Sequence, residues 1–111
     1  MIMRKKQFIG RTVLVGINFL DHDRSLLERY ETHGTIEEIT NELIKISREE
    51  GKFQLPFREG GLQEARPGVY REKTTGSVIK NPDYLATLNL VMRDPAQIEY
   101  CKQHGYQPKG N

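Results

Sequence analysis

Two stretches of the chain alternate apolar and polar side chains with the period of a β-strand. In residues 12–20 (TVLVGINFL), the odd-numbered side chains from Val13 to Phe19 fall on one face. Residues 84–92 (YLATLNLVM) alternate again, with apolar side chains on both faces. β-Branched and aromatic residues at period two are typical of strands. Both stretches are therefore predicted strands, and part of each face of the second should be covered.

Between these two strands, residues 51–84 contain three of the five prolines and three short apolar or aromatic runs (FQLPF, GVY and SVI). Each run is too short for a helix and is bounded by Gly, Pro and charged residues. Residues 68–80 fit a hairpin, GVYREK-TTG-SVIK, with a three-residue loop. Pro56 lacks an amide donor, so its strand ends there or lies at a sheet edge. This alternation of short apolar runs and turn residues predicts small antiparallel β-structure.

A hairpin is also predicted directly after the first strand. Residues 21–25 (DHDRS) carry short polar side chains that stabilise turns. Residues 26–32 then form the return strand, and His33 with Gly34 either ends it or introduces a bulge.

The next segment supports two interpretations. As a helix, residues 35–50 begin with a capping box of Thr35 and Glu38 and end before Gly51, a favourable C-terminal cap. As strands, TIEEI and LIKIS flank a turn at residues 40–42. Local propensity and periodicity slightly favour the helix.

The last predicted element is a C-terminal helix. Asp94 is a suitable N-cap, Pro95 suits the first turn, and Gln97 occupies the third helical position. The helix should run to about His104 and stop at Gly105. Its narrow apolar stripe consists of Ile98 and Cys101, with Tyr100 as a candidate third member.

Composition is consistent with one small domain. The chain has 111 residues, of which 36% are hydrophobic and 29% charged, with 17 basic against 15 acidic side chains. A thin core is expected, as in a one-layer barrel. We divide the chain into a basic N-terminal lead-in (1–10), a β-barrel-like domain (11–93), a C-terminal helix (94–105) and a flexible tail (106–111).

Membrane and secreted classes are not favoured. The longest apolar run, residues 13–20, is far shorter than the ~20 residues that span a bilayer. The N-terminus lacks the apolar region and cleavage site of a signal peptide. A single cysteine, Cys101, allows no internal disulfide and suits a reducing compartment. We expect a soluble, cytoplasmic protein.

Several short sequence elements follow one another along the chain: VLVGI, His33-Gly34, GKFQLPF, PGVY, TGSV and NPDYL. This succession covers about residues 11–91 and resembles a family of small uncharacterised bacterial β-barrel-like proteins. The chain departs from that pattern at Phe57, where a second proline is common, and at Asn81, where Asp is common. None of the shared elements is a chemical signature.

The resemblance implies an all-β fold, mainly antiparallel, in the form of a small barrel or sandwich of about six to eight short strands with one short C-terminal α-helix. It also implies that residues 35–47 form two strands. That expectation replaces the slight local preference for a helix there.

Candidate chemistry is sparse. His22 between Asp21 and Asp23 fits a metal or acid–base cluster, but a polar turn is the favoured interpretation. His33 is either a structural hydrogen-bonded histidine or a binding residue that faces a cleft with Tyr30 or Glu31. For Cys101, packing in the helix is favoured over a reactive thiol. No metal-ligand, nucleotide-binding or nucleophile motif occurs, so neither an enzyme nor a cofactor is expected.

The favoured function is a non-catalytic protein-binding module, with an inhibitor or immunity protein as one concrete form. The candidate binding residues are Tyr30, His33, Arg66, Tyr70, Arg71 and Lys73. The alternative is a barrel that binds RNA or single-stranded nucleic acid, because aromatic and basic residues interleave in part. The members of that set are Phe53, Phe57, Arg58, Arg66, Tyr70, Arg71 and Lys73. An unpaired edge strand would also allow a homodimer.

Overall fold

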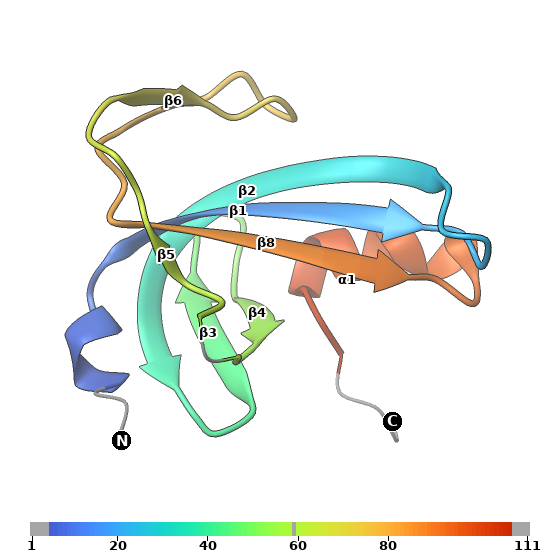
Figure 1. The fold of residues 1–111 in the computed structure, drawn as a ribbon, viewed down its shortest axis with the longest axis horizontal. Helices are drawn as coiled ribbons and strands as arrows, with labels where there is room; N and C mark the ends of the chain where they lie inside the picture. The colour runs from blue at the N-terminus through green and yellow to red at the C-terminus, as the bar shows by residue number, and fades with distance from the viewer. Residues whose placement is uncertain (1–4, 59, 108–111) are drawn as a thin grey trace.

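A computed structural model describes residues 5–58 and 60–107. Within these residues the chain forms eight β-strands in two sheets, two 3-10 helices and one α-helix (Figure 1). The predicted all-β class with a short C-terminal helix is therefore confirmed. In the described part of the chain, no helix has the length and apolar character needed to cross a membrane.

The elements follow one another as η1 (Lys5–Phe8), β1 (Thr12–Leu20), β2 (Leu26–Ile39), β3 (Leu43–Ser47), β4 (Phe53–Pro56), β5 (Gln63–Glu64), β6 (Val69–Arg71), β7 (Val78–Lys80), β8 (Tyr84–Val91), η2 (Pro95–Gln97) and α1 (Ile98–His104). Six strands form one sheet in the order β4-β3-β2-β1-β8-β5, and β6 and β7 form a separate pair. All neighbours are antiparallel except β1 and β8.

The two strands with the clearest alternation lie side by side at the centre of the large sheet. β1 and β8 run parallel, and Ile17 is the register partner of Leu88. The odd-numbered side chains of β1 face the core, where Val13, Ile17 and Phe19 are fully buried. Because paired residues share a face, the even-numbered side chains of β8 point to the same side. One shared core thus explains the apolar odd-numbered face of β1 and the apolar even-numbered face of β8, whereas Val91 on the other face of β8 is exposed.

Residues 35–47 form strands, as the resemblance implied, and not the helix that local signals favoured. β2 pairs with β1 up to Thr35 and with β3 from Thr35 onwards. In this arrangement Ile36, Ile44 and Ile46 are at most 2% exposed. Thr35 and Glu38 thus lie within β2 and cap no helix. The turn at residues 40–42 is stabilised by Thr40, whose Oγ1 accepts a hydrogen bond of 2.9 Å from the Leu43 amide.

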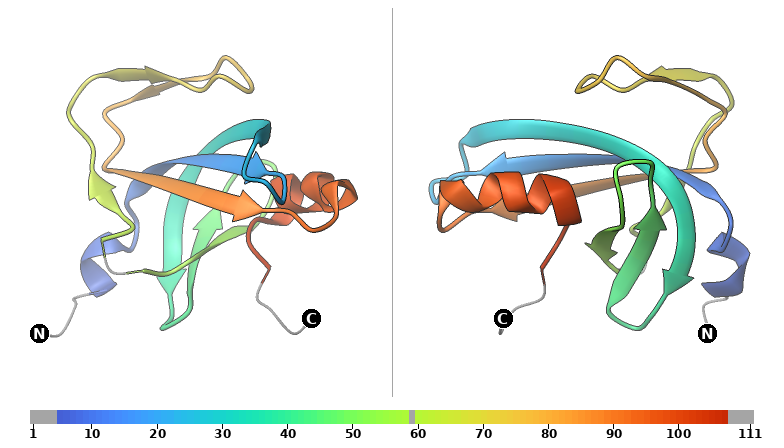
Figure 2. Two further views of the ribbon diagram at one scale, coloured as in Figure 1. Left: turned by 45° about the vertical axis from the view of Figure 1, so that its right-hand side comes forward. Right: turned by 180° about the vertical axis from the view of Figure 1, so that it is seen from behind.

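The sheet curls where β2 passes from β1 to β3, and Gly34 lies at this point. A Cβ atom there would meet the Ser47 carbonyl oxygen and lie 2.6 Å from Ile46 Cγ2. Only glycine therefore fits without a backbone shift. The curl places β3 and β4 over one face of the sheet (Figures 1 and 2).

The C-terminal helix packs on this concave side. Asp94 accepts a hydrogen bond of 3.0 Å from the Ala96 amide and so caps η2, whereas α1 itself begins at Ile98 without a side-chain cap. The first turn of the predicted helix is therefore a 3-10 turn. Ile98 and Cys101 are buried in the core, whereas Tyr100 is half exposed and does not join their stripe. Figure 2 shows α1 on the side of the sheet opposite to the β6–β7 hairpin.

Both ends of the chain contribute to the domain. In the N-terminal lead-in, Phe8 is buried and packs edge-on against Tyr84, with ring centroids 5.0 Å apart. In the predicted tail, the Tyr106 amide donates a 2.8 Å hydrogen bond to the Gln54 carbonyl. The remaining expectations at the ends concern residues 1–4 and 108–111, which lie outside the described residues.

Several local predictions differ from the structure. The return strand neither ends nor bulges at His33 and Gly34, because β2 continues to Ile39 and its pairing with β1 is regular there. The loop of the β6–β7 hairpin spans residues 72–77, not three residues, because Arg71 and Val78 form its last pair. Glu72 leaves the strand there and its side chain is buried. β5 was not predicted, since two polar residues carry no periodic signal.

We expect Gly34→Ala to lower the free energy of unfolding by about 1–3 kcal/mol, because the added Cβ must displace backbone at β3. Urea denaturation measures the loss. Gly16→Ala is the matched control, since the three atoms nearest to its Cβ would all belong to the flexible guanidinium of Arg29. Equal effects of the two substitutions would contradict the proposed crowding at Gly34.

Candidate functional site

The β6–β7 hairpin stands apart from the large sheet and extends over β2 (Figure 1). We call residues 66–80 the hairpin arm. Of its six strand residues only Ile79 is buried, and it lies outside the main core cluster. The arm therefore contributes little to the central core, and its position depends on other contacts.

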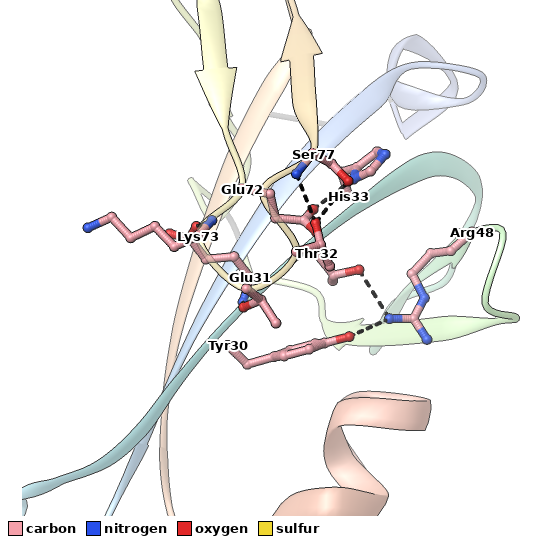
Figure 3. Close-up of polar contacts among 10 residues, drawn as sticks. Tyr30, Glu31, Thr32, His33, Arg48, Glu72, Lys73 and Ser77 are labelled. Atoms are coloured by element: carbon pink, nitrogen blue, oxygen red, sulfur yellow. Dashed lines mark hydrogen bonds and ion pairs between the residues drawn. The ribbon is translucent and has the colours of Figure 1, made fainter.

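The first of these contacts is a buried carboxylate. The Glu72 side chain is 2% exposed, and its Oε2 lies 2.7 Å from His33 Nδ1 on β2 (Figure 3). Its Oε1 accepts a hydrogen bond of 2.7 Å from Thr75 Oγ1. Both carboxylate oxygens thus have partners, which offsets the cost of removing the charge from water.

A second contact joins the same two segments. Glu31 Oε1 accepts a hydrogen bond of 2.6 Å from the Lys73 amide. The Glu31 amide in turn donates to Thr74 Oγ1 at 2.9 Å. Because Glu31 and His33 are two residues apart on a strand, both point to the outer face of the sheet. The tip of the arm is fastened to that face by polar groups.

The two candidates on β2 lie on opposite faces. His33 points outward to Glu72, whereas Tyr30 is buried on the inner face. There, Arg48 donates hydrogen bonds of 3.1 Å to both the Tyr30 hydroxyl and Thr32 Oγ1 (Figure 3). Its other Nη atom donates to the Gln103 carbonyl at 2.8 Å. Tyr30 and His33 therefore do not share a cleft, but His33 and Glu31 share the arm's anchoring surface.

The four remaining candidates lie on the arm itself. The Tyr70 hydroxyl donates to the Arg66 carbonyl at 2.9 Å, and Arg71 donates to the Gly76 carbonyl at 3.2 Å. These bonds fix the backbone of the arm. The basic side chains of Arg66, Arg71 and Lys73 are exposed, as is that of Lys80.

The outward side of the arm is apolar as well as basic. Val69 is 69% exposed and Val78 is 48% exposed. Cross-strand pairing places Val69 opposite Lys80 and Arg71 opposite Val78. The result is a surface on which two valines and two cations alternate.

The aromatic and basic residues of the nucleic-acid hypothesis do not share one face. Phe53 is 1% exposed in the core, with the Arg48 guanidinium 4.3 Å from its ring centroid. Phe57 packs against the same core cluster. Tyr70 lies in the separate β6–β7 sheet. Stacking of bases on all three rings would require the core to open.

Glu72 and Arg48 are the residues that sequence reasoning missed. Glu72 lies between Arg71 and Lys73 in a basic stretch, and Arg48 lies in the segment that suits either a helix or strands. Neither lies in a periodic pattern that signals burial, because each is positioned by a contact distant along the chain. No local signal could have found them.

The other candidate groups have ordinary surroundings. His22 Nδ1 lies 3.0 Å from Asp21 Oδ1, and its side chain is 86% exposed in a polar turn. Among residues 5–58 and 60–107, no three His, Cys, Asp or Glu side chains converge on a metal site. Cys101 is buried, and burial raises the pKa of its thiol because the thiolate is poorly solvated there.

Comparison of the chain with family models, with curated proteins and with solved structures found no match in any of the three.

A double-mutant cycle of His33→Ala and Glu72→Ala should give a coupling free energy of about 1 kcal/mol, measured by urea denaturation. The Glu38–Lys45 pair, 3.7 Å apart with both side chains exposed, is the control. We expect its coupling to be near zero, as for most surface pairs. Equal couplings for the two pairs would show that the buried carboxylate does not depend on His33.

The Cys101 thiol should react slowly with iodoacetamide at mildly alkaline pH. Its raised pKa leaves less thiolate at any given pH than a free cysteine has. We expect the folded protein to react at least roughly tenfold more slowly than the same protein in denaturing urea. Equal rates, followed by mass spectrometry, would mean that the helix does not protect the thiol.

Proposed function

We propose that the protein is a non-catalytic protein-binding module that contacts its partner through the outward side of the hairpin arm. The observation that carries this proposal is the exposure of Val69 and Val78 on a hairpin that is held in place by a buried glutamate. A two-stranded hairpin by itself is only marginally stable in water, and covering its two exposed valines would remove apolar surface from water. Their placement is useful when a second surface covers them.

The charge of the arm indicates the chemistry of the partner. Residues 65–82 contain four basic side chains and one acidic side chain, Glu72, which is buried. The outward side of the arm is therefore positive around an apolar centre. It suits an acidic protein surface with an apolar patch, since complementary charge accelerates association and excludes wrong partners.

An inhibitor or immunity protein is one form that such a module takes, because a rigid protruding hairpin can enter the active site of another protein. The resemblance to small bacterial β-barrel-like proteins agrees with a compact binding domain but supplies no activity. The single buried cysteine supports the cytoplasm as the compartment.

Nucleic acid is the second candidate, because four cations on one protruding hairpin also suit phosphate groups. The acidic protein surface is preferred for two reasons. The valines offer no hydrogen bonds to a nucleic-acid backbone, and the Tyr70 hydroxyl is already used by the Arg66 carbonyl.

The test is capture of partners from native cells by the wild-type protein and by an Arg71→Glu, Lys80→Glu double variant. The wild type should retain a partner protein after nuclease treatment. The double variant should capture at least roughly tenfold less of that protein. The control carries Lys6→Glu and Arg93→Glu, which change the net charge equally at two other exposed positions. It should bind like the wild type.

The outcome that favours nucleic acid is equally clear. Captured material would then disappear with nuclease, and binding would fall steeply between low salt and about 0.5 M salt. Equal loss of binding in both double variants would mean that overall charge, not the arm, determines capture.

A further inference from the structure

A second surface of the molecule is an open sheet edge on β8. β5 pairs only with Tyr84 and Leu85, near the start of β8 (Figure 1). In the described part of the chain, no strand pairs with residues 86–91 on that side. Most of β8 therefore has one paired edge, toward β1, and one unpaired edge.

The pairing pattern identifies the unpaired backbone groups. The Met92 amide donates to the Leu20 carbonyl at 2.8 Å, so the even-numbered residues of β8 turn their backbone groups toward β1. Backbone groups alternate along a strand. The amides and carbonyls of Thr87, Asn89 and Val91 consequently point to the open side.

This edge lacks the usual protection against pairing. Residues 84–91 contain no proline and no charged side chain, although natural edges are commonly blocked by such residues. The opposite edge of the sheet is different. β4 ends in Pro56, and Gly105 and Tyr106 lie against Gln54 through a bridge and a 2.8 Å hydrogen bond.

A cleft of about 320 Å³ with both polar and apolar walls lies beside the open edge, between β8 and the β3–β4 hairpin. Its apolar walls are formed by Ile44, Leu55, Pro56, Ala86 and Leu88. Since Ala86 and Leu88 belong to β8 itself, a strand added to this edge would direct alternate side chains into the cleft.

Two arginines line the same cleft. Arg24 and Arg58 are both exposed, and no hydrogen bond or ion pair joins either guanidinium group to another of the described residues. Arg24 is held at φ 70°, an uncommon conformation for a residue other than glycine, by the turn in which its amide donates to the Asp21 carbonyl. Two cations beside this cleft complement an acidic ligand.

We propose that the open edge of β8 binds an extended peptide segment that carries acidic residues. The peptide pairs with the backbone of Thr87, Asn89 and Val91, places apolar side chains in the cleft, and presents carboxylates to Arg24 and Arg58. This surface is separate from the hairpin arm. It adds a second interaction of a different kind, strand addition in place of side-chain contact.

A second copy of the chain is the competing occupant, as in the homodimer that an edge strand allows. Pairing of two β8 strands would satisfy the same backbone groups. It would bring no carboxylate from β8 to either arginine, because residues 84–91 are uncharged. Charge complementarity therefore favours the acidic peptide.

The experiment is an NMR titration of the full chain with the capped peptide Asp-Thr-Val-Thr-Val-Thr-Asp, in which the Asp and Val side chains share one face. We expect shifts of the Thr87, Asn89 and Val91 amides and slower exchange of these protons with solvent. A peptide with Lys in place of both Asp residues should bind more weakly. A peptide with Pro in place of the central Thr and of the Val before it should not bind, because adjacent amides point in opposite directions and one of the two lost donors faces β8.

Variants separate the parts of the site. Arg24→Gln with Arg58→Gln should weaken peptide binding by about three- to tenfold, as expected for two solvent-exposed ion pairs. Thr87→Pro should abolish it while the protein stays folded, because the lost amide faces the open side. Arg93→Gln is the matched control for the arginines and should leave binding unchanged. The same holds for the arm variant with Arg71→Glu and Lys80→Glu, so failure of one proposal leaves the other testable.

Three results would overturn the inference. The first is a concentration-dependent dimer in size-exclusion chromatography that Thr87→Pro converts to a monomer, which would assign the edge to a second copy. The second is equal binding of the acidic and the basic peptide. The third is the absence of shifts at the three amides at millimolar peptide, with Arg24→Gln and Arg58→Gln having no effect.

Discussion

The structure depends on one long strand, β2, which pairs with β1 along its first part and with β3 along its last part. The change of partner strand occurs at Gly34 and Thr35. The absence of a side chain at Gly34 lets the Ser47 carbonyl approach closely. That approach curls the sheet and encloses the core between β1, β3, β4 and β8. Without it, the buried isoleucines of residues 36–46 would lose their shared interior.

Different forces hold the two faces of β2. Its inner face packs in the apolar core, with Arg48 linking the hydroxyls of Tyr30 and Thr32 to the end of α1. Its outer face holds the hairpin arm through carboxylates and short polar contacts. Burial is non-directional, whereas hydrogen bonds fix orientation. The arm is thus held in one orientation although it buries little apolar surface.

This division explains why both proposed surfaces are located where the fold is least closed. The arm lies outside the core, so its valines and cations are available without cost to packing. The edge of β8 is open because β5 pairs only with its first two residues, and because β4 does not pair with β8 although the sheet curls. Both surfaces consist of strands with an unpaired edge or an uncovered face.

The sequence by itself determined the strands β1 and β8, the hairpin of β6 and β7 and the capped C-terminal helix. In each of these, period, turn residues and caps act within a few residues of one another. It did not determine residues 35–47, where the buried isoleucines suit a helix or two strands until the partner strands are known.

Tertiary structure alone decided that β1 and β8 are parallel neighbours, that Glu72 is buried against His33, and that Tyr30 and His33 face opposite sides. The open edge beside Arg24 and Arg58 also became visible only in three dimensions. Each of these features joins residues far apart in the chain. Such contacts depend on how the sheet is ordered and curled, and local side-chain patterns do not encode that order.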